Sequence, residues 1–423
     1  MSPRLACLLA AALMSSVASA ALAAPATPLE RARAVLKDSP VIDGHNDLPW
    51  RIRVKLGGRS DGLDLKDEAA VKAAGYDTDI PRLRRGGVGG QFWSLWVPGE
   101  LKGADATVAV EKQMDLTRRL VARYPADLQM AFSADDIVKA EKAGKVASLM
   151  GVEGGEGIDN SLEVLRQLYL LGARYMTLTH FGDTDWADSS NGEPVHNGLT
   201  PFGKSVVKEM NRLGMLVDLS HVAPKTMSDA LDVSEAPVIF SHSSARALVD
   251  HPRNVPDAIL KRVATNGGIV MVNMVPNYIN DAVRHWEADT SAEETRQKAL
   301  HVGDPAGAKA AIDAWKAAHP RPAITIKDWA DHAQHVRDVA GIDHVGVGAD
   351  FGDADDFPDG VTGVDAYLPL VAELASRGWS DADLKKFTGQ NLIRVLREVE
   401  AAAAKIQTTR RASEDMIAVL DKK

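Results

Sequence analysis

The chain has 423 residues, of which 45% are hydrophobic and 25% are charged, so its composition is that of an ordinary folded protein. The formal net charge of −9 argues against a basic surface that binds nucleic acid, so no nucleic-acid partner is expected. The only cysteine, Cys7, excludes an intramolecular disulfide, a thiolate zinc site and an iron–sulfur cluster.

The N-terminus has the pattern of a secretory signal peptide. Arg4 supplies a positive charge, and residues 5–14 form an apolar run that is too short to span a membrane. Small-residue cleavage sites end at residues 20 and 23, so we expect residues 1–20 to be removed, with cleavage as late as 23 as the alternative. This predicts an exported protein, periplasmic or secreted; a buried N-terminal helix is the competing interpretation. No later segment reads as a membrane span or a lipid anchor, so neither is expected.

Short apolar runs alternate with helical patterns along most of the chain. Eight runs end in turn signals, at residues 40–44, 87–97, 146–152, 173–179, 215–220, 237–241, 268–273 and 345–349. Helical spacing follows at residues 161–171, 202–213, 330–339 and 381–396. Such alternation is typical of a parallel sheet covered by helices, and eight units predict an α/β fold, a (β/α)₈ barrel over residues 21–400. A Rossmann fold is not supported, because no G-x-G-x-x-G follows the first strand.

Two segments exceed the needs of a minimal barrel. Residues 275–324 form a long insertion after the seventh strand, and residues 401–423 form an Ala-rich, charged C-terminal helix. Either segment could mediate formation of a homodimer, while solvated decoration is the simpler interpretation.

Histidines and carboxylates gather at the ends of the predicted strands. Of the 12 histidines, four follow four different strands. The residues concerned are His45, His180, His221 and His242, with Asp47, Glu153 and Asp350 as carboxylates in equivalent places. Because the carboxyl ends of barrel strands supply catalytic groups, these side chains predict one site.

The residue types are those of a dinuclear metal site. His45 and Asp47 are two residues apart, so in extended backbone both point to one face and can hold one ion. Glu153 offers two oxygens that can bridge two ions, and His221 with His242 can hold the second ion. Nitrogen and oxygen ligands of this kind suit Zn²⁺ best, with Mn²⁺, Co²⁺ or Fe²⁺ as substitutes. Two such ions can share a hydroxide that attacks a carbonyl carbon.

His180 and Asp350 then remain for an oxyanion contact and a proton shuttle. Structural alternatives stand beside these interpretations, because a single strand-end histidine is more often a hydrogen-bonded structural residue. Asp43 and Asp218 are candidates for orienting ligand imidazoles, and Gly154 with its neighbour Gly155 could only permit a tight turn. The coincidence of six such elements favours the metal site.

Seven short motifs occur at or near the strand ends. They are DGHNDLPW (43–50), GVEGG (151–155), YMTLTH (175–180), PFG (201–203), DLSH (218–221), VIFSHSS (238–244) and RNVPD (253–257). Together, over about residues 39–398, they closely resemble the membrane (renal) dipeptidase family of metallopeptidases. The resemblance implies a barrel of the metal-dependent hydrolase (amidohydrolase) superfamily and two zinc ions. It also implies hydrolysis of dipeptides with a free C-terminal carboxylate, with tolerance of a D-residue there.

The resemblance also implies a metal-ligand set. His45 and Asp47 match ligands of the first zinc ion, and Glu153 matches the bridging carboxylate. His221 and His242 match ligands of the second zinc ion.

Three further residues match groups that act on the substrate. His180 resembles the residue that contacts the scissile carbonyl, and Asp350 resembles the general acid/base. Arg253 resembles the guanidinium that binds the substrate carboxylate. Glu156, where eukaryotic members usually carry His, and the loop 351–356 depart from the family pattern, which leaves the side-chain preference open.

The sequence therefore predicts an exported zinc dipeptidase. One alternative keeps the metal site and acts on other amides or lactones, as an N-acyl-D-amino acid deacylase or a β-lactam hydrolase. The other is a non-catalytic periplasmic binding protein, against which a complete ligand set and a proton shuttle argue.

Overall fold

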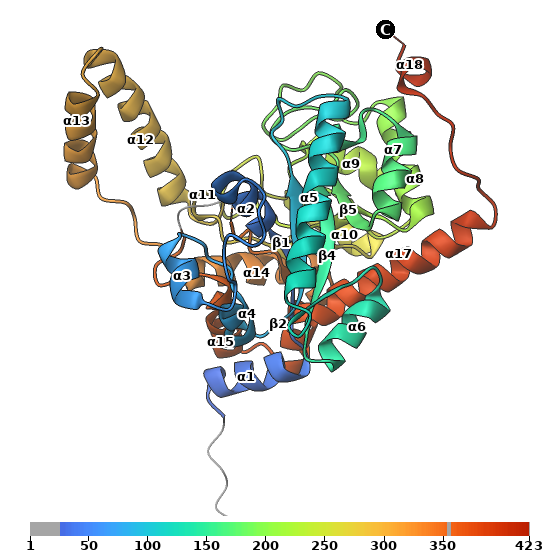
Figure 1. Ribbon diagram of the computed structural model, residues 1–423, viewed down its shortest axis with the longest axis horizontal. Coiled ribbons are helices and arrows are strands. Elements are labelled where there is room, and N and C mark those ends of the chain that lie inside the picture. The colour runs from blue at the N-terminus through green and yellow to red at the C-terminus, as the bar shows by residue number, and fades with distance from the viewer. Residues whose placement is uncertain (1–25, 353–356, 423) are drawn as a thin grey trace, which may run out of the picture.

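The eight predicted strands form one parallel sheet that curves into a barrel (Figure 1). The computed structural model describes residues 26–352 and 357–422, so the predicted signal peptide and its cleavage sites lie outside the described residues. The strands are β1 (Val41–Asn46), β2 (Val88–Trp96), β4 (Val146–Glu153), β5 (Ala173–Thr177), β6 (Leu216–Asp218), β7 (Ile239–Phe240), β8 (Ile269–Val272) and β9 (Val345–Val347). Each strand pairs in parallel with the next in this order. A short strand that was not predicted, β3 (Leu128–Met130), pairs with the first half of β4.

The first and last strands meet just beyond the regular ladder. The backbone N–H of Asp47 donates to the carbonyl of Phe351 at 2.7 Å, and Asn46 forms an isolated parallel bridge with the same residue. One layer deeper, the buried carboxylate of Asp43 accepts from the backbone N–H of Ala349 at 2.7 Å. These contacts close the predicted (β/α)₈ barrel, which is confirmed.

Side chains in the regular parts of the strands alternate between the barrel interior and the helical layer, while β1 is irregular between Asp43 and Asn46. Inward-facing residues share one apolar cluster: Ile42, Phe92, Leu149, Tyr175, Leu216, Ile239, Ile269 and Met271. Their neighbours Val41, Trp93, Met150, Met176, Val217, Phe240, Val270 and Val272 belong to the outer cluster. This division follows from the two-residue period of a strand. Leu392 and Val395 of the last long helix join the inner cluster and cover the amino end of the barrel.

One helix precedes β1, and the other helices of the barrel layer follow the strands. They are α1 (Pro28–Asp38), α2 (Leu48–Leu56), α3 (Glu68–Ala73), α4 (Ile80–Gly86), α5 (Ala104–Arg123), α6 (Ala134–Lys142), α7 (Leu162–Leu170), α8 (Pro201–Leu213), α9 (Pro224–Val233), α10 (Asp257–Asn266), α14 (Ile326–Ala340), α15 (Tyr367–Ser376), α16 (Asp381–Lys385) and α17 (Asn391–Gln407). The start of α8 is capped, since the Thr200 hydroxyl accepts from the N–H of Gly203 and Pro201 opens the helix. The helix predicted over 381–396 contains a π-helical turn at Lys386–Gln390, which separates α16 from α17.

The insertion 275–324 forms a helical hairpin that projects from the barrel (Figure 1). It contains α11 (Pro276–Ile279), α12 (Asp281–Leu300) and α13 (Pro305–Ala318), and α13 packs chiefly against α12. The side chain of Asn280, at the base, donates to Asp328 of α14 at 2.8 Å. Within the described part of the chain, the hairpin therefore stands beside the barrel.

The C-terminal segment differs from the single helix expected over 401–423. Helix α17 ends at Gln407 and a turn follows at residues 408–409. Residues 410–416 then run in an extended path, and among the described residues only α18 (Ile417–Leu420) follows. The extended path is held by side chains of α8, because Glu209 accepts from the N–H of Ser413 at 3.3 Å. Asp421 accepts from the N–H of Phe202 at 3.0 Å, at the first turn of α8. These partners satisfy the polar groups of the segment outside a helix.

Among the described residues, no helix is both long enough and apolar enough to cross a membrane.

A close approach at the top of the barrel core generates a stability prediction. A Cβ atom on Gly348, just after β9, would lie 1.8 Å from the carbonyl oxygen of Ser241. We expect Gly348→Ala to lower the free energy of unfolding by about 2–3 kcal/mol, because a backbone atom must move. Equilibrium unfolding in urea measures this change.

The matched control is Gly99→Ala, since a Cβ there meets no described atom within 4 Å. We expect the control to stay within about 0.5 kcal/mol of the wild type. Equal stabilities of the two variants would contradict the prediction.

Candidate metal centre and active site

The structure brings all the predicted site residues to the carboxyl end of the barrel. His45 is the last residue but one of β1, and Asp47 follows that strand. Glu153 ends β4, and the other four lie two or three residues beyond their strands: His180, His221, His242 and Asp350. All are buried, as is Arg253 from the loop after β7. A cavity of about 330 Å³ is lined by Asp47, Trp50, Trp96, Glu153, His180, Phe181, His221, Arg253, Tyr278 and Asp350.

Glu153 lies at the centre of this cluster. Its Oε2 atom is 3.4 Å from Nε2 of His45. Its Oε1 atom is 3.0 Å from Nε2 of His221 and 3.3 Å from Nε2 of His242. The two oxygens thus face imidazoles from different strands, as a bridging carboxylate must.

His45 and Asp47 converge as predicted, although by a turn and not by extended backbone. Asp47 has left the strand and begins the turn into α2, with φ −92° and ψ 16°. Its Oδ2 atom nevertheless lies 3.3 Å from Nε2 of His45.

The donor set fits divalent metal ions. Three groups of ligand atoms each lie within 4.8 Å of one another: His45, Glu153 and His242; Glu153, His180 and His221; and His45, Asp47 and Asp350. Nε2 of His45 is buried and has no hydrogen-bond partner among the described residues, although three carboxylates surround it. A buried nitrogen lone pair between carboxylates is the arrangement that a cation would satisfy.

Hydrogen bonds at Nδ1 turn two of the imidazoles toward this centre. Nδ1 of His45 lies 2.9 Å from the Tyr175 hydroxyl. Nδ1 of His242 lies 2.8 Å from the Ser241 hydroxyl, which donates to Asp218 at 2.6 Å. Because that hydroxyl proton points to Asp218, His242 must donate from Nδ1, which leaves Nε2 free to bind a metal.

The two expected orienting carboxylates therefore have different roles. Asp218 reaches His242 through Ser241, so it supports a ligand indirectly. Asp43 instead accepts from Ala349 N–H and from the Gln91 amide, each at 2.7 Å, so it joins strands. Tyr175 occupies the orienting place beside His45.

Two site residues hold left-handed backbone. His221 has φ 68° and Asp350 has φ 70°, which few residues other than glycine adopt. Each conformation costs on the order of 1 kcal/mol or more and persists only where the surroundings enforce it. Both residues lie three residues beyond a strand end, where the turn directs the side chain into the centre.

The electrostatics favour neutral imidazoles beside an ionised carboxylate. Burial lowers the pKa of His221 and His242 well below the usual histidine value, and the charge on Arg253 adds to this effect. Burial raises the pKa of Glu153, but the neighbouring histidines outweigh it and the pKa lies well below its usual range. At His45 burial lowers the pKa, but Glu153 and Asp47 raise it well above its ordinary value. That nitrogen therefore sits where positive charge is stabilised.

Arg253 is a buried cation beside this centre. One nitrogen donates to the Ser243 hydroxyl and another to the His242 carbonyl, each at 3.3 Å, and the guanidinium lies 5.6 Å from the Tyr278 ring. Within the described residues no carboxylate pairs with it, and its Nε has no hydrogen-bond partner. A guanidinium held in this way is suited to bind a carboxylate of a ligand.

Sequence reasoning missed several residues of the site. Ser94 donates to Oε2 of Glu153 at 2.9 Å, and Trp96, two residues on, lines the cavity. Both lie at the end of β2, which carries no titratable residue and so gave no signal. Ser94 and Trp96 are two and four residues after Phe92, so the two-residue period of a strand would have placed both side chains on the same inward face. Of the insertion, only Tyr278 lines the cavity, so the hairpin does not roof it.

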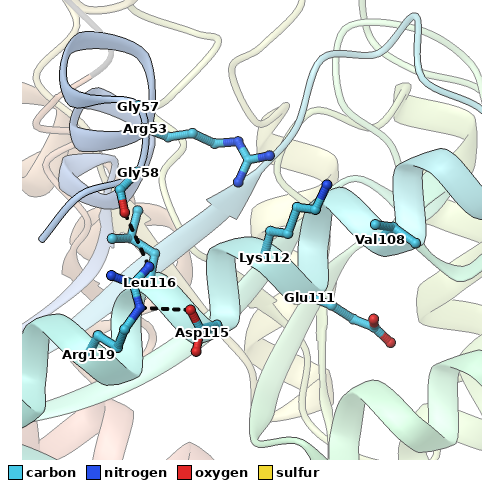
Figure 2. Close-up of a pocket in the computed structure, with 9 residues that line it drawn as sticks. All are labelled: Arg53, Gly57, Gly58, Val108, Glu111, Lys112, Asp115, Leu116 and Arg119. Atoms are coloured by element: carbon cyan, nitrogen blue, oxygen red, sulfur yellow. Dashed lines mark hydrogen bonds and ion pairs between the residues drawn. The ribbon is translucent and has the colours of Figure 1, made fainter.

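A wider groove lies elsewhere on the surface, between α2 and α5 (Figure 2). It encloses about 1180 Å³ and contains none of the predicted site residues. Arg53 and Lys112 reach into it, while Arg119 pairs with Asp115 at 2.7 Å. Size alone does not identify the active site of this protein.

A parallel barrel with imidazoles and carboxylates buried at the carboxyl ends of its strands defines a barrel metallohydrolase. The chain belongs to the membrane dipeptidase family, peptidase family M19, whose sequence profile matches residues 29–410. The predicted enzyme class, a metallodipeptidase, is thereby confirmed at the level of the family.

Solved structures share the architecture. The probable dipeptidase PvdM from Pseudomonas aeruginosa is 25% identical, over 89% of this chain and 99% of that chain, with a TM-score of 0.73. A metallo peptidase from Rhodobacter sphaeroides, liganded with a phosphinate mimic of the dipeptide L-Ala-D-Ala, is 22% identical over 85% and 99%, with a TM-score of 0.70. The dipeptidase AC of family M19 is 23% identical over 85% and 98%, with a TM-score of 0.70. The last two likenesses support the fold.

The contact between Tyr175 and His45 generates a prediction for metal binding. Tyr175→Phe removes the hydroxyl beside Nδ1 and keeps the buried ring. We expect the affinity for the ion at His45 to fall about 10- to 100-fold, because the imidazole loses its orienting partner. Competition between the protein and a chelator for Zn²⁺ measures the affinity.

The control is Tyr169→Phe, which removes the same hydroxyl from a partly exposed ring on α7. Its metal affinity should equal that of the wild type. If Tyr175→Phe binds Zn²⁺ as tightly as the control, the hydroxyl does not orient the ligand.

Proposed function

We propose that this protein is a zinc-dependent dipeptidase that hydrolyses dipeptides with a free C-terminal carboxylate and tolerates a D-residue at that position. The observation that carries the proposal is a small cavity that contains the Glu153 cluster, Asp350 and the buried Arg253, which pairs with no carboxylate among the described residues. One cavity can therefore hold a carboxylate and the adjacent peptide bond together. Tolerance of a D-residue is supported by the L-Ala-D-Ala mimic bound to the Rhodobacter sphaeroides structure.

Two zinc ions would be held by the residues that the structure brings together. His45 and Asp47 would bind one ion, His221 and His242 the other, and Glu153 would bridge them. When bound, a pair of such ions supplies an activated water and polarises the scissile carbonyl.

The remaining chemistry belongs to three side chains. Arg253 holds the substrate carboxylate, which sets the distance of the peptide bond from the metal ligands. His180 has a pKa lowered by burial, so it is a neutral imidazole that can donate a hydrogen bond to the carbonyl oxygen. Asp350 accepts a proton from the attacking water and returns it to the leaving amine. Because Arg253 holds the carboxylate beside the metal ligands, longer peptides whose C-terminus lies further from the scissile bond should be poor substrates.

An assay of purified protein loaded with Zn²⁺ tests the proposal. The substrates are L-Ala-L-Ala, L-Ala-D-Ala, L-Ala-L-Ala amide and N-acetyl-D-Ala. We expect cleavage of both free dipeptides, loss of activity after chelation, and recovery with Zn²⁺. The amide should be a poor substrate, because Arg253 then has no carboxylate to bind.

Two other results would contradict the proposal and define a different function. Cleavage of N-acetyl-D-Ala alone would keep the metal site but define a deacylase. Binding of dipeptides without hydrolysis would define a binding protein.

The variant Asp350→Asn separates a proton shuttle from a metal ligand. Asp350 lies 3.8 Å from Nε2 of His45, so its position alone is compatible with either role. We expect the variant to bind both ions and to lose turnover about 10²–10⁴-fold, because the amide cannot accept the proton. Metal analysis and steady-state kinetics on the same sample measure the two effects. Loss of one equivalent of metal would instead assign Asp350 as a ligand.

Export with removal of residues 1–20, or of residues up to 23, stays a prediction, as does assembly into a homodimer.

A further inference from the structure

Trp96 makes a specific hydrogen bond to His180. Its side chain faces the barrel interior with Ser94, and its indole Nε1–H donates to Nδ1 of His180 at 3.0 Å. Trp96 is therefore the indole of β2 that reaches a proposed catalytic imidazole, whereas Trp93 lies in the outer apolar cluster.

This contact fixes which nitrogen of His180 carries the proton. An indole N–H is a donor only, so Nδ1 of His180 must accept. In a neutral imidazole the proton then sits on Nε2. Nε2 is the atom directed toward the site, 3.8 Å from Oε1 of Glu153.

Aromatic rings pack against both partners of this hydrogen bond. The Trp50 ring packs edge-on against Trp96, with centroids 4.3 Å apart. The His180 ring lies between Phe181 and His221, at 4.2 and 4.3 Å. A flip of the imidazole would set a carbon against the indole N–H, and a proton on Nδ1 would set a hydrogen against it, so either change would lose the hydrogen bond.

We propose that Trp96 is a positioning residue for peptide hydrolysis, because its N–H holds His180 as the Nε2–H tautomer that donates to the scissile carbonyl oxygen. This inference rests on the function proposed above. It gives His180 the role of an oriented neutral donor, so the proton transferred to the leaving amine passes through Asp350. A preorganised hydrogen-bond donor stabilises the carbonyl oxygen most strongly in the transition state, when negative charge develops on that oxygen.

The kinetic test replaces the indole N–H. In Trp96→Phe, and in a protein with benzothienylalanine at position 96, which keeps the ring shape and replaces N–H by sulfur, we expect kcat to fall about tenfold or more. The dipeptide KM should change less than kcat, and the zinc content should stay at the wild-type level. Trp93→Phe is the matched control, because it lies on the same strand and its Nε1 has no hydrogen-bond partner in the described structure. Its kcat should equal that of the wild type.

The spectroscopic test needs no substrate. In zinc-loaded protein with ¹⁵N-labelled histidine, long-range ¹H–¹⁵N spectra report the protonation of each ring nitrogen, and His180→Gln assigns the signals. We expect a protonated Nε2 and an unprotonated Nδ1 in the wild type, with this pattern lost in Trp96→Phe.

Two results would overturn the inference: a proton on Nδ1 in the wild type, or an unchanged kcat in both proteins that lack the indole N–H. If the wild type shows the expected tautomer and cleaves no dipeptide, the proposed function is overturned, and the tautomer assignment is upheld.

Discussion

The structure depends on the burial of one carboxylate, Glu153, among imidazoles that come from four different strands. A lone buried carboxylate is strongly destabilising, and so is a group of imidazoles packed without partners. When the carboxylate and the imidazoles lie together, each offsets the cost of burying the other. This arrangement requires the strands to end at the same level along the barrel axis. The closure between β1 and β9, the register of β4 against both neighbours, and the inward side chains of β2 all serve this requirement.

Much of the fold and of the candidate metal site could be predicted because the informative residues are of types rarely found at their positions. Histidine and carboxylate are rare at the ends of apolar strands, so His45, Glu153 and His242 were recognisable together, because such residues recur at the ends of several predicted strands. The supporting residues were not recognisable, because Tyr175 and Trp96 are typical strand residues and their polar atoms become significant only through a three-dimensional neighbour. The tail after Gln407 was mispredicted for a related reason, since Glu209 and other side chains of α8 offer it partners that no local pattern reveals.

Left-handed backbone at His221 and Asp350 shows where the chain departs from the local preferences that shape the rest of the barrel. Regular strands deliver side chains in two directions only, inward or outward. A centre that gathers side chains above the strand ends needs a third direction, and a turn at positive φ provides it. Among the described residues other than glycine, left-handed backbone also occurs at Asp159, Asn160 and Asn197 in the loops, while the layers of Ile, Val, Leu and Phe beneath the site remain regular.

The helical hairpin also determines where this protein can change in size. Both of its ends leave the barrel at one place, beside α14, and its two long helices pack chiefly against each other. Shortening, lengthening or replacing the outer turns would alter few contacts of the barrel layer and none of the residues that line the cavity. A new recognition element could therefore be fused to the outer end of this hairpin, in evolution or by engineering, without disturbing the catalytic barrel.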